Sequence, residues 1–264
     1  MEWKIIHIDE TDSTNRWLKD HGVGDHGVGA PDRSVARDQE NRPRDCGDQE
    51  NRPHDCALCV LADYQTAGRG CGTNKWESER GKNLLFSLLI HPEGIPAAKQ
   101  FHISMAISLA ICEALGQHIG DLSIKWPNDI YWRNGKIGGI LIENRLQGST
   151  IKDCIIGVGL NINQREFHSD APNPVSLWQI CEHETDRDQL LQDILKAFEE
   201  MMGLVIKERY MQMLYRRKGF HPYVDKDGAF MAQLVDVEDD GHLLLCDDNG
   251  QQRRYAFKEV QYVI

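Results

Sequence analysis

The stretch KWPNDIYWRNGKIGGILIE, residues 125–143, organises the rest of the chain, because it joins a tight polar cluster to a hairpin signal. Pro127 fixes the backbone φ angle and so stiffens the turn that begins at Lys125. Asn128 and Asp129 follow directly, so an ammonium, an amide and a carboxylate group lie within one turn.

The second half of this stretch predicts a β-hairpin. Asn134-Gly135 stands between two apolar runs, which is the strongest short-range signal for a tight turn between antiparallel strands. The turn places Lys136 at the start of the returning strand, beside the polar cluster, where Gly138 and Gly139 allow a close approach of the backbone. Two lysines, an asparagine and an aspartate at one strand end favour chemistry on a phosphate group.

Length and charge narrow the class of protein. The chain has 264 residues, enough for one large domain and a small one, and its formal net charge is −11. Such a chain gains no bulk electrostatic attraction to nucleic acid. No apolar run approaches the roughly 18 residues that cross a bilayer, and the first residues lack a signal-peptide pattern. We therefore expect a cytoplasmic protein with neither a membrane nor a nucleic-acid partner.

The eight cysteines are expected to be reduced. Several lie in apolar segments, where a free thiol behaves as a small hydrophobe. Cys46, His54, Cys56 and Cys59 have a local spacing like that of a zinc site. Because Cys59 falls inside a strand-like apolar run, the sequence argues against such a site.

Three small polar residues, Ser13, Thr14 and Asn15, stand between a β-prone run at 3–8 and a predicted helix. Asp12 or Ser13 suits the N-cap position of that helix. Capping alone explains these residues, but a helix N-terminus with three small polar side chains is also suited to hold a ureido or carboxylate group.

Residues 20–56 differ in composition from their surroundings. They contain no aromatic residue, and DQENRPRDC at 38–46 recurs as DQENRPHDC at 48–56. A segment so poor in apolar groups cannot offset the entropy lost on ordering. We expect an insertion in a surface loop, without catalytic residues.

A glycine-rich loop, QTAGRGCGTNKW at 65–76, follows the predicted strand at 57–64. Its three glycines let the backbone approach a ligand closely, and Arg69 and Lys75 add positive charge. A plain turn between strands would look similar. The loop fits neither the Walker A pattern nor the dinucleotide fingerprint, so another nucleotide geometry is indicated.

The remaining pattern predicts an α+β fold. Apolar strands are expected at 83–90 and 154–163, a helix over 96–118, and a second helix that follows a capping box at Asp186 and Gln189 and runs, with interruptions, to about 217. Asn161 closes the strand at 154–163 and suits either a pocket floor or a turn. After Gly219, short apolar runs alternate with Asp-Gly and Asn-Gly turns, which predicts a small all-β module. The predicted domains are 1–217, with the insertion at 20–56, and 218–264.

These motifs resemble those of the biotin protein ligases (biotin:acetyl-CoA-carboxylase ligases). The matching segments are STN at 13–15, QTAGRG at 65–70 with Trp76 downstream, GKNLLFSLLI at 81–90, KWPND at 125–129, KIGGILIE at 136–143 and GVGLNIN at 157–163. The resemblance covers nearly the whole chain outside the insertion. It implies a mixed β-sheet with helices packed on one face, related to the class II aminoacyl-tRNA synthetases, followed by a small C-terminal all-β barrel.

The resemblance also implies an activity. The enzyme would use ATP, with Mg²⁺, to convert biotin to biotinyl-5′-AMP and then transfer biotin to a lysine of an apo biotin carboxyl carrier domain. The implied catalytic residues are Lys136, Arg69 and Asp129. The residues implied to bind biotin are Ser13, Thr14, Asn15, Gln65, Gly68, Arg69, Gly70, Cys71, Trp76, Lys136 and Gly139. Those implied to bind ATP or the adenylate are Arg69, Lys125, Asn128, Asp129 and Asn161. No metal-ligating residue is predicted, and we expect a monomer or a weak homodimer.

Two features depart from the family pattern. Some relatives carry an N-terminal helix-turn-helix, whereas the catalytic motifs here begin near the first residue, so we expect no repressor role. Many relatives have further arginines after GRG, where this chain has Cys71, so Arg69 carries more of the loop's charge.

Alternatives remain for the activity and for one residue. A lipoate ligase would use the same adenylate chemistry, and a non-catalytic binder of biotin or nucleotide could retain the motifs. Asp129 would either orient or deprotonate the acceptor lysine or simply form a salt bridge to Lys125 or Lys136.

Overall fold

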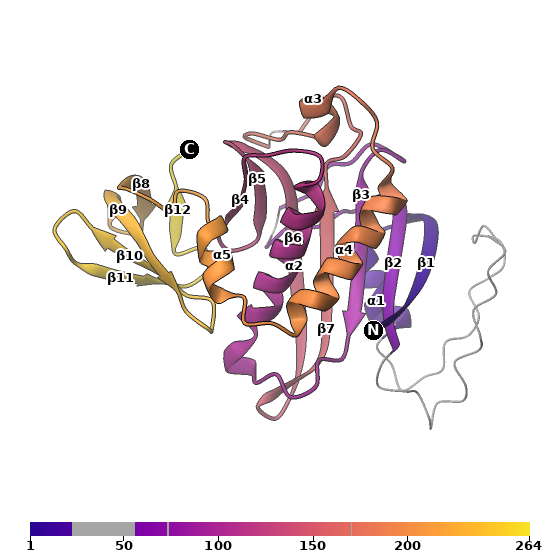
Figure 1. Cartoon of the computed structure of the whole chain (residues 1–264), viewed down its shortest axis with the longest axis horizontal. Helices are drawn as coiled ribbons and strands as arrows, with labels where there is room; N and C mark the ends of the chain where they lie inside the picture. Colours follow the sequence, from indigo (N-terminus) through magenta and orange to yellow (C-terminus); the bar gives the residue numbers. More distant parts are fainter. Residues whose placement is uncertain (23–55, 73, 170) are drawn as a thin grey trace. The chain divides into compact units, whose positions relative to one another are not determined.

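The computed structural model, drawn in Figure 1, describes residues 1–22, 56–72, 74–169 and 171–264. The chain divides into two compact units. Unit 1 comprises Met1–Ile95 and Gly138–Arg187, and unit 2 comprises Pro96–Ile137 and Asp188–Ile264. The predicted domain boundary at 217 and 218 remains a proposal.

A mixed β-sheet forms the framework of unit 1 (Figure 1). Its strands are β1 (Glu2–Thr11), β2 (Cys56–Gln65), β3 (Leu84–Ile90), β7 (Thr150–Leu160) and most of β6 (Gly135–Gln147). β1 pairs with β2 in parallel, and β2–β3, β3–β7 and β7–β6 are antiparallel. The complete order of this seven-stranded sheet is β1-β2-β3-β7-β6-β5-β4. The predicted mixed sheet is confirmed.

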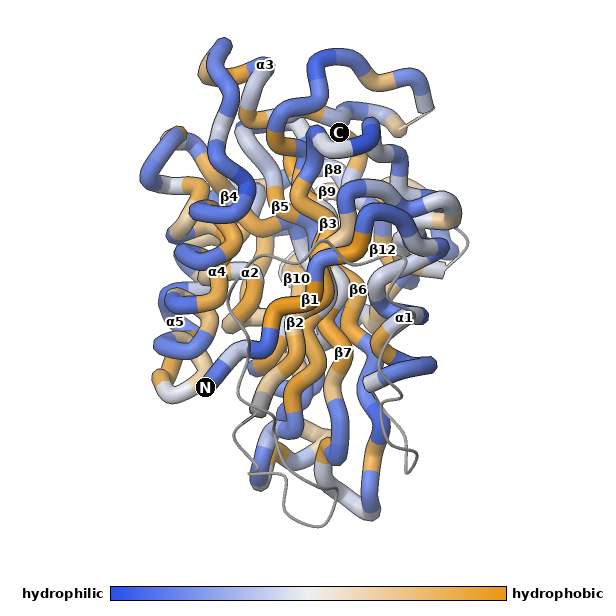
Figure 2. The backbone as a smooth tube through the Cα atoms, turned by 90° about the vertical axis from the view of Figure 1, so that its right-hand side faces the viewer, coloured by the Kyte–Doolittle hydropathy of each residue, from blue (hydrophilic) through white to orange (hydrophobic). Residues whose placement is uncertain are grey.

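The apolar runs in the sequence become the buried strands of this sheet. All seven residues of β3 are buried, and Figure 2 shows that β2, β3 and β7 consist largely of hydrophobic residues. A continuous apolar run of this kind is typical of a strand covered on both faces. One face of the sheet is covered by α1 (Thr14–His21) through Leu18, which packs with Ile8, Val60, Leu89 and Ile155.

Helix α1 continues slightly into the predicted insertion. Asp20 and His21 form its last turn, and the His21 ring stacks on Trp17 with ring centroids 4.5 Å apart. At the other end, Cys56 is the first residue of β2. The repeats between them, at 38–46 and 48–55, lie outside the described residues.

In unit 2, a buried helix supports a short hairpin. Helix α2 (Phe101–Leu115) follows a single 3₁₀ turn (Ala97–Lys99) and packs against β4 (Leu122–Lys125), β5 (Asp129–Trp132) and α5 (Lys207–Met213). Helix α4 (Arg187–Met202) precedes α5. The predicted helices are therefore confirmed, and the predicted interruption of the second one lies between Met202 and Lys207.

The turn between β5 and β6 lies one residue earlier than predicted. Its two residues are Arg133 and Asn134, and Gly135 already belongs to β6. Arg133 adopts a left-handed conformation with φ 50°, because its N–H donates to the Asp121 carbonyl oxygen at 3.0 Å and its guanidinium pairs with the Asp121 carboxylate. Lys136 is the second residue of β6, so the prediction that it lies at the start of the returning strand is confirmed.

The end of the chain forms an antiparallel sheet in unit 2. Its strands are β8 (His221–Asp225), β9 (Gly228–Val237), β10 (Leu243–Asp247), β11 (Gln252–Tyr255) and β12 (Val260–Tyr262). They are ordered β11-β10-β9-β8-β12. The predicted small all-β region is confirmed, and its pairing runs from β11 at one edge to β12 at the other.

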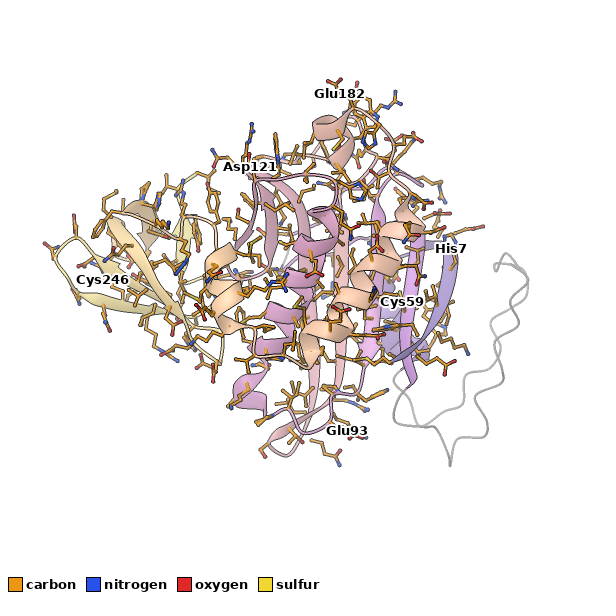
Figure 3. The ribbon with its side chains drawn as sticks, viewed as in Figure 1. His7, Cys59, Glu93, Asp121, Glu182 and Cys246 are labelled. Atoms are coloured by element: carbon orange, nitrogen blue, oxygen red, sulfur yellow. The ribbon has the colours of Figure 1, made fainter. Side chains whose placement is uncertain are left out.

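The structure also bears on the cysteines. Cys59 lies inside β2 (Figure 3), and burial raises the pKa of its thiol to about 12, so this residue is an inert core side chain. Cys46 and His54, two further members of the zinc-like spacing, lie outside the described residues. No helix in the described part of the chain is both long and apolar enough to span a membrane.

Candidate functional site

The N-terminus of α1 carries a buried polar cluster, here called the α1 cradle and made of Ser13, Thr14, Asn15, Gln65 and Ser87. After β1 ends, the Asp12 carboxylate accepts a hydrogen bond from the Ser13 N–H at 2.6 Å and the chain turns into the helix. Ser13 occupies the N-cap position, as predicted, but its side chain makes no capping hydrogen bond. Ser13, Thr14 and Asn15 are only 4%, 3% and 3% exposed. Capping therefore does not account for their burial.

Hydrogen bonds connect the cradle across three elements. Gln65, the last residue of β2, accepts from the backbone N–H of Thr14 at 2.8 Å and from its hydroxyl at 3.2 Å. The Ser87 hydroxyl, on β3, lies 2.6 Å from both the Thr14 hydroxyl and the Asn15 carbonyl oxygen. The Asn15 side-chain oxygen accepts from Ser87 and, as an amide oxygen, has a second lone pair, so the cradle is suited to a ligand that brings an N–H donor.

Ser87 was not predicted as a site residue. The signal was available, because a single serine interrupts the apolar run NLLFSLLI at 83–90. A fully buried hydroxyl in such a strand requires a partner, and here the partners are in α1.

Two glycines of β7 let side chains lie directly on the sheet beneath the cradle. A Cβ atom at Gly157 would stand 2.1 Å from the Asn15 side-chain oxygen, and one at Gly159 would stand 2.6 Å from the Trp76 ring. Gly139 of β6 lies opposite Gly159 in the ladder. Gly138 was expected to allow a close approach of the backbone to a ligand. Its lack of a Cβ atom instead makes room for the Leu160 side chain, with which a Cβ at this position would clash.

Glu143 on β6 closes the cradle from the other side and was not predicted either. Its carboxylate accepts from the Asn15 side-chain amide at 3.0 Å and from the Lys19 ammonium at 2.7 Å. Burial opposes ionisation of Glu143, but these two hydrogen bonds and the charges of Lys19 and Arg69 outweigh it and lower its pKa. Glu143 is therefore a carboxylate at neutral pH.

The glycine-rich loop folds back on itself next to the cradle. The Gly70 N–H donates to the Asn74 carbonyl at 2.8 Å, and the Trp76 N–H donates to the Gly68 carbonyl at 3.0 Å. The backbones of Arg69 and Lys75 form an isolated antiparallel β-bridge. The Arg69 side chain is exposed, Cys71 is half-buried, and the Trp76 ring lies against Gly159. The loop thus brings an arginine and an indole ring to the edge of the cradle in unit 1.

In unit 2, Lys125, Asp129 and Lys136 form a second cluster, here called the lysine cluster. Lys125 and Asp129 are the last paired residues of the β4–β5 ladder, which places their side chains together. The Asp129 carboxylate lies 2.6 Å from the Lys136 ammonium and 3.8 Å from the Lys125 ammonium. The sequence prediction that these three residues meet at one strand end is confirmed.

Aromatic rings surround Lys125. Its ammonium lies 5.3 Å from the ring centroid of Tyr131 and 5.2 Å from that of Tyr262, within cation–π range. Burial is the main cause that lowers the pKa of Lys125, and the charges of Lys136 and Arg216 lower it further, against the opposing effect of Asp129. The cluster therefore holds more positive than negative charge, in a setting that favours an added anion.

Asn128 and Asn161, the two predicted adenylate-binding amides, differ in their surroundings. Asn128 is half-buried in the turn between β4 and β5, next to the lysine cluster in the chain. Asn161 follows β7, and its side chain donates to the Val175 carbonyl at 3.2 Å while its own carbonyl accepts from the Leu177 N–H. Turn chemistry therefore accounts for contacts of Asn161, and its ligand role stays a prediction.

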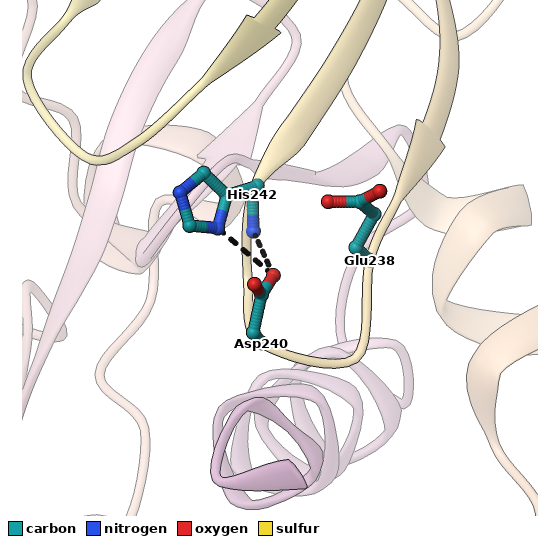
Figure 4. Close-up of side chains that lie close together, drawn as sticks. All are labelled: Glu238, Asp240 and His242. Carbon is teal, nitrogen blue, oxygen red and sulfur yellow. Dashed lines mark hydrogen bonds and ion pairs between the residues drawn. The ribbon is translucent and has the colours of Figure 1, made fainter. Parts of the chain in front are cut away.

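One group of side chains in the described residues has the composition of a metal site. Glu238, Asp240 and His242 lie together after β9, as Figure 4 shows. Arg254 occupies both carboxylates, at 2.6 Å from Glu238 and 2.7 Å from Asp240, and His242 pairs with Asp240 at 2.9 Å. Since the ligand atoms are already engaged by a cation and by one another, this group is an ion-pair network that fixes the β9–β10 turn.

Comparison with known proteins identifies relatives. Residues 47–161 match the family model of the biotin/lipoate A/B protein ligase family. The bifunctional ligase/repressor BirA of Bacillus subtilis is 30% identical over 220 residues, which are 75% of this chain and 64% of that protein. The biotin--[acetyl-CoA-carboxylase] ligase of Paracoccus denitrificans is 33% identical over 146 residues, 53% of this chain and 60% of that protein. The chain thus spans somewhat less than two thirds of the length of these relatives.

Solved structures share the fold. A biotin protein ligase from Aquifex aeolicus, in complex with biotin and ATP, superposes with a TM-score of 0.72 and 23% identity over 98% of this chain and 99% of that chain. A biotin protein ligase from Leishmania major, in complex with biotinyl-5-AMP, has a TM-score of 0.59 and 20% identity over 96% of this chain and 98% of the other. The predicted architecture, a mixed sheet with helices and a C-terminal all-β region, is the architecture of these proteins.

Proposed function

The chain belongs to the biotin/lipoate A/B protein ligase family through residues 47–161, and from this premise we propose that it is an ATP-dependent biotin protein ligase. The observation that carries the proposal is the α1 cradle, a polar cluster in which the buried Asn15 side-chain oxygen accepts from Ser87 and has a second lone pair for a ligand. A ureido ring supplies N–H donors to such a cluster, and relatives of this chain are biotin ligases.

The cradle favours biotin over lipoate as the substrate. The dithiolane ring of lipoate has no hydrogen-bonding group comparable with a ureido ring, so it would leave Asn15 and Ser87 buried without their ligand contacts. A site built to hydrogen-bond a ligand rejects an analogue that lacks the group by roughly 10⁴- to 10⁵-fold. In this proposal the other biotin contacts are Ser13, Thr14, Gln65, Gly68, Arg69, Gly70, Cys71, Trp76, Lys136 and Gly139.

The first half-reaction requires cations. A carboxylate oxygen of biotin attacks the α-phosphorus of ATP, the bond between that phosphorus and the α,β-bridging oxygen breaks, and pyrophosphate leaves with the electron pair. Because an anion attacks an anion, positive charge must offset the charge of the transition state. We assign this role to Lys136 and Arg69, with Lys125, Asn128, Asp129 and Asn161 holding the nucleotide.

Mg²⁺ would accompany ATP. Mg²⁺ prefers oxygen ligands and keeps several waters, so it is commonly held through one or two carboxylates and substrate phosphates. Asp129 is the carboxylate of the lysine cluster, but two lysines already engage it. The phosphate oxygens of ATP are therefore the proposed main ligands, and Mg²⁺ would supply further neutralisation of phosphate charge.

In the second half-reaction, the ε-amine of a carrier lysine attacks the acyl carbon of biotinyl-5′-AMP and AMP leaves. An ordinary lysine, with a pKa near 10.4, is mostly protonated at neutral pH and must lose a proton first. Asp129 would have to release one of its lysines to accept that proton, so its proposed role is to orient the amine. Arg69 and the glycine-rich loop would cover the anhydride and exclude water.

The proposed partner is an apo biotin carboxyl carrier domain. We further propose that the protein acts as a monomer or weak homodimer in the cytoplasm, without nucleic acid or a membrane. The alternative of a non-catalytic biotin or nucleotide binder predicts tight biotin binding without turnover.

Biotin-dependent exchange of labelled pyrophosphate into ATP tests the proposed first half-reaction. The wild-type protein should exchange label with biotin and not with lipoate. Lys136→Met should lower the exchange rate by about 100-fold or more, the usual effect of removing a group that stabilises transition-state charge. Lys152→Met removes an exposed lysine of β7 and is the matched control. Binding of biotin without exchange would instead support the non-catalytic binder.

A further inference from the structure

Glu143 links strand β6 to helix α1, and no step of the proposed reaction assigns it a role. It is on β6, and its two carboxylate oxygens have different partners in α1. One oxygen accepts from the Asn15 side-chain nitrogen at 3.0 Å, and the other accepts from the Lys19 ammonium at 2.7 Å. The Glu143 side chain is 24% exposed, so water reaches it only in part.

The contact with Glu143 decides which way the Asn15 amide points. An asparagine amide has a donor end and an acceptor end of nearly equal size, and only its neighbours distinguish them. The donor end of Asn15 faces Glu143 and the Leu141 carbonyl oxygen, the latter at 3.3 Å, and both of these groups are acceptors only. The acceptor end therefore faces Ser87 and lies above Gly157.

We propose that Glu143 is a positioning residue that fixes the Asn15 amide with its oxygen toward the ligand, so that the cradle selects a ligand that presents an N–H donor. This inference rests on the proposed function, because the N–H donor would be a ureido nitrogen of biotin. The Asn15 side-chain oxygen accepts from Ser87 and has a second lone pair, so it retains capacity for a ligand N–H.

The ionised state of Glu143 matters to this role. A carboxylate offers acceptors alone, so the Asn15 nitrogen must face it. Glutamine at this position offers one donor and one acceptor, and Asn15 could then adopt either orientation. Lys19 contributes charge to Glu143 but does not touch Asn15 in the described contacts, so the two effects are separable by substitution.

The test measures affinities of purified protein for biotin and for biotin methylated at one or the other ureido nitrogen. Glu143→Gln should lower the affinity for biotin by about tenfold, the change expected when a charge-assisted hydrogen bond becomes a neutral one. It should also shrink the preference for biotin over at least one N-methyl derivative, while the affinity for ATP stays the same. A purely structural loss would weaken every biotin derivative by the same factor.

Further variants separate orientation from charge. Glu143→Asp keeps the charge near Lys19 but withdraws the carboxylate from Asn15, and it should reduce the preference in the same way. Lys19→Met should leave the preference unchanged, as should Glu184→Gln, a matched change in the exposed pair with Lys82. Calorimetric melting of each variant shows that it is folded at the temperature of the assay.

The outcomes distinguish this inference from the proposed function. Wild-type binding of biotin with an unchanged preference in both Glu143 variants would overturn the positioning role and leave the ligase proposal intact. Failure of the wild-type protein to bind biotin would overturn both.

Discussion

Replacing Gly157 with alanine tests the geometry of the α1 cradle directly. The added Cβ would lie 2.1 Å from the Asn15 side-chain oxygen and 2.8 Å from its Cγ, distances under 3.0 Å that real Cβ atoms essentially never show. Asn15 cannot simply rotate away, because its amide is bound to Glu143 and Leu141 on one side and to Ser87 on the other. The strand or the helix must shift.

The expected cost follows from the bonds that Asn15 gives up. Losing one charge-assisted and one neutral hydrogen bond lowers the free energy of unfolding by about 2–4 kcal/mol. Chemical denaturation measures this change, and biotin titration should show an affinity loss of at least about tenfold, since 1.4 kcal/mol corresponds to a factor of ten. Gly120→Ala is the control, because a Cβ at Gly120 meets nothing within 4 Å.

A double-mutant cycle of Gly157→Ala and Asn15→Ala tests whether the Asn15 side chain is the group that the added Cβ would meet. In an Asn15→Ala background the clash partner is absent, so Gly157→Ala should cost less than about 0.5 kcal/mol of additional stability. An equal cost of Gly157→Ala in both backgrounds would show that Asn15 is not held over this glycine, and the description of the cradle would be wrong.

Four further outcomes are expected. Gly159→Ala should displace the Trp76 ring, which would lie 2.6 Å from the added Cβ, and should lower the affinity for biotin more than the affinity for ATP in calorimetric titrations. An equal loss of both affinities would argue against contact between the Trp76 indole ring and biotin. Ser176→Ala removes a capping box and should lower the unfolding free energy by about 1 kcal/mol in urea titrations without changing biotin affinity. Lys136→Met should lower single-turnover formation of the adenylate by about 100-fold, whereas a normal rate would exclude a charge-stabilising role. Glu143 has a lowered pKa in the folded protein, so it stabilises the fold above the ordinary value of 4.5 and loses this effect as the pH falls below it. The free energy of unfolding should therefore fall less steeply below pH 4.5 in Glu143→Gln than in the wild-type protein, as denaturant titrations at several pH values would measure.

The lysine cluster could be predicted because its members are close in the chain. Asp129 lies four residues after Lys125 and seven before Lys136, and a hairpin between two short strands brings them together almost irrespective of the rest of the fold. The turn itself shifted by one residue because Asp121, outside the hairpin, stabilises Arg133 in a left-handed conformation. Local sequence carries no sign of that contact.

The α1 cradle could be predicted only in part. The polar run at 13–15 and Gln65 were visible as motifs, but Ser87 and Glu143 are 72 and 128 residues from Asn15 in sequence. They meet Asn15 because β3, β7 and β6 are neighbours in the sheet, and strand order of this kind is set by long-range packing. Helix α3 (Leu177–Cys181) was missed because five residues are too few to show helical periodicity, although its cap at Ser176 and Gln179 is a recognisable pattern.

Attachment of biotin to a carrier lysine by this chain would change the intact mass of the carrier, which mass spectrometry measures. The protein would be incubated with ATP, Mg²⁺ and an apo biotin carboxyl carrier domain, with biotin or with lipoate. We predict that the carrier gains one biotinyl group on a single lysine, that the gain is lost with Lys136→Met and kept with Lys152→Met, and that lipoate gives none. A carrier of unchanged mass, or one that gains a lipoyl group, would contradict the proposed activity.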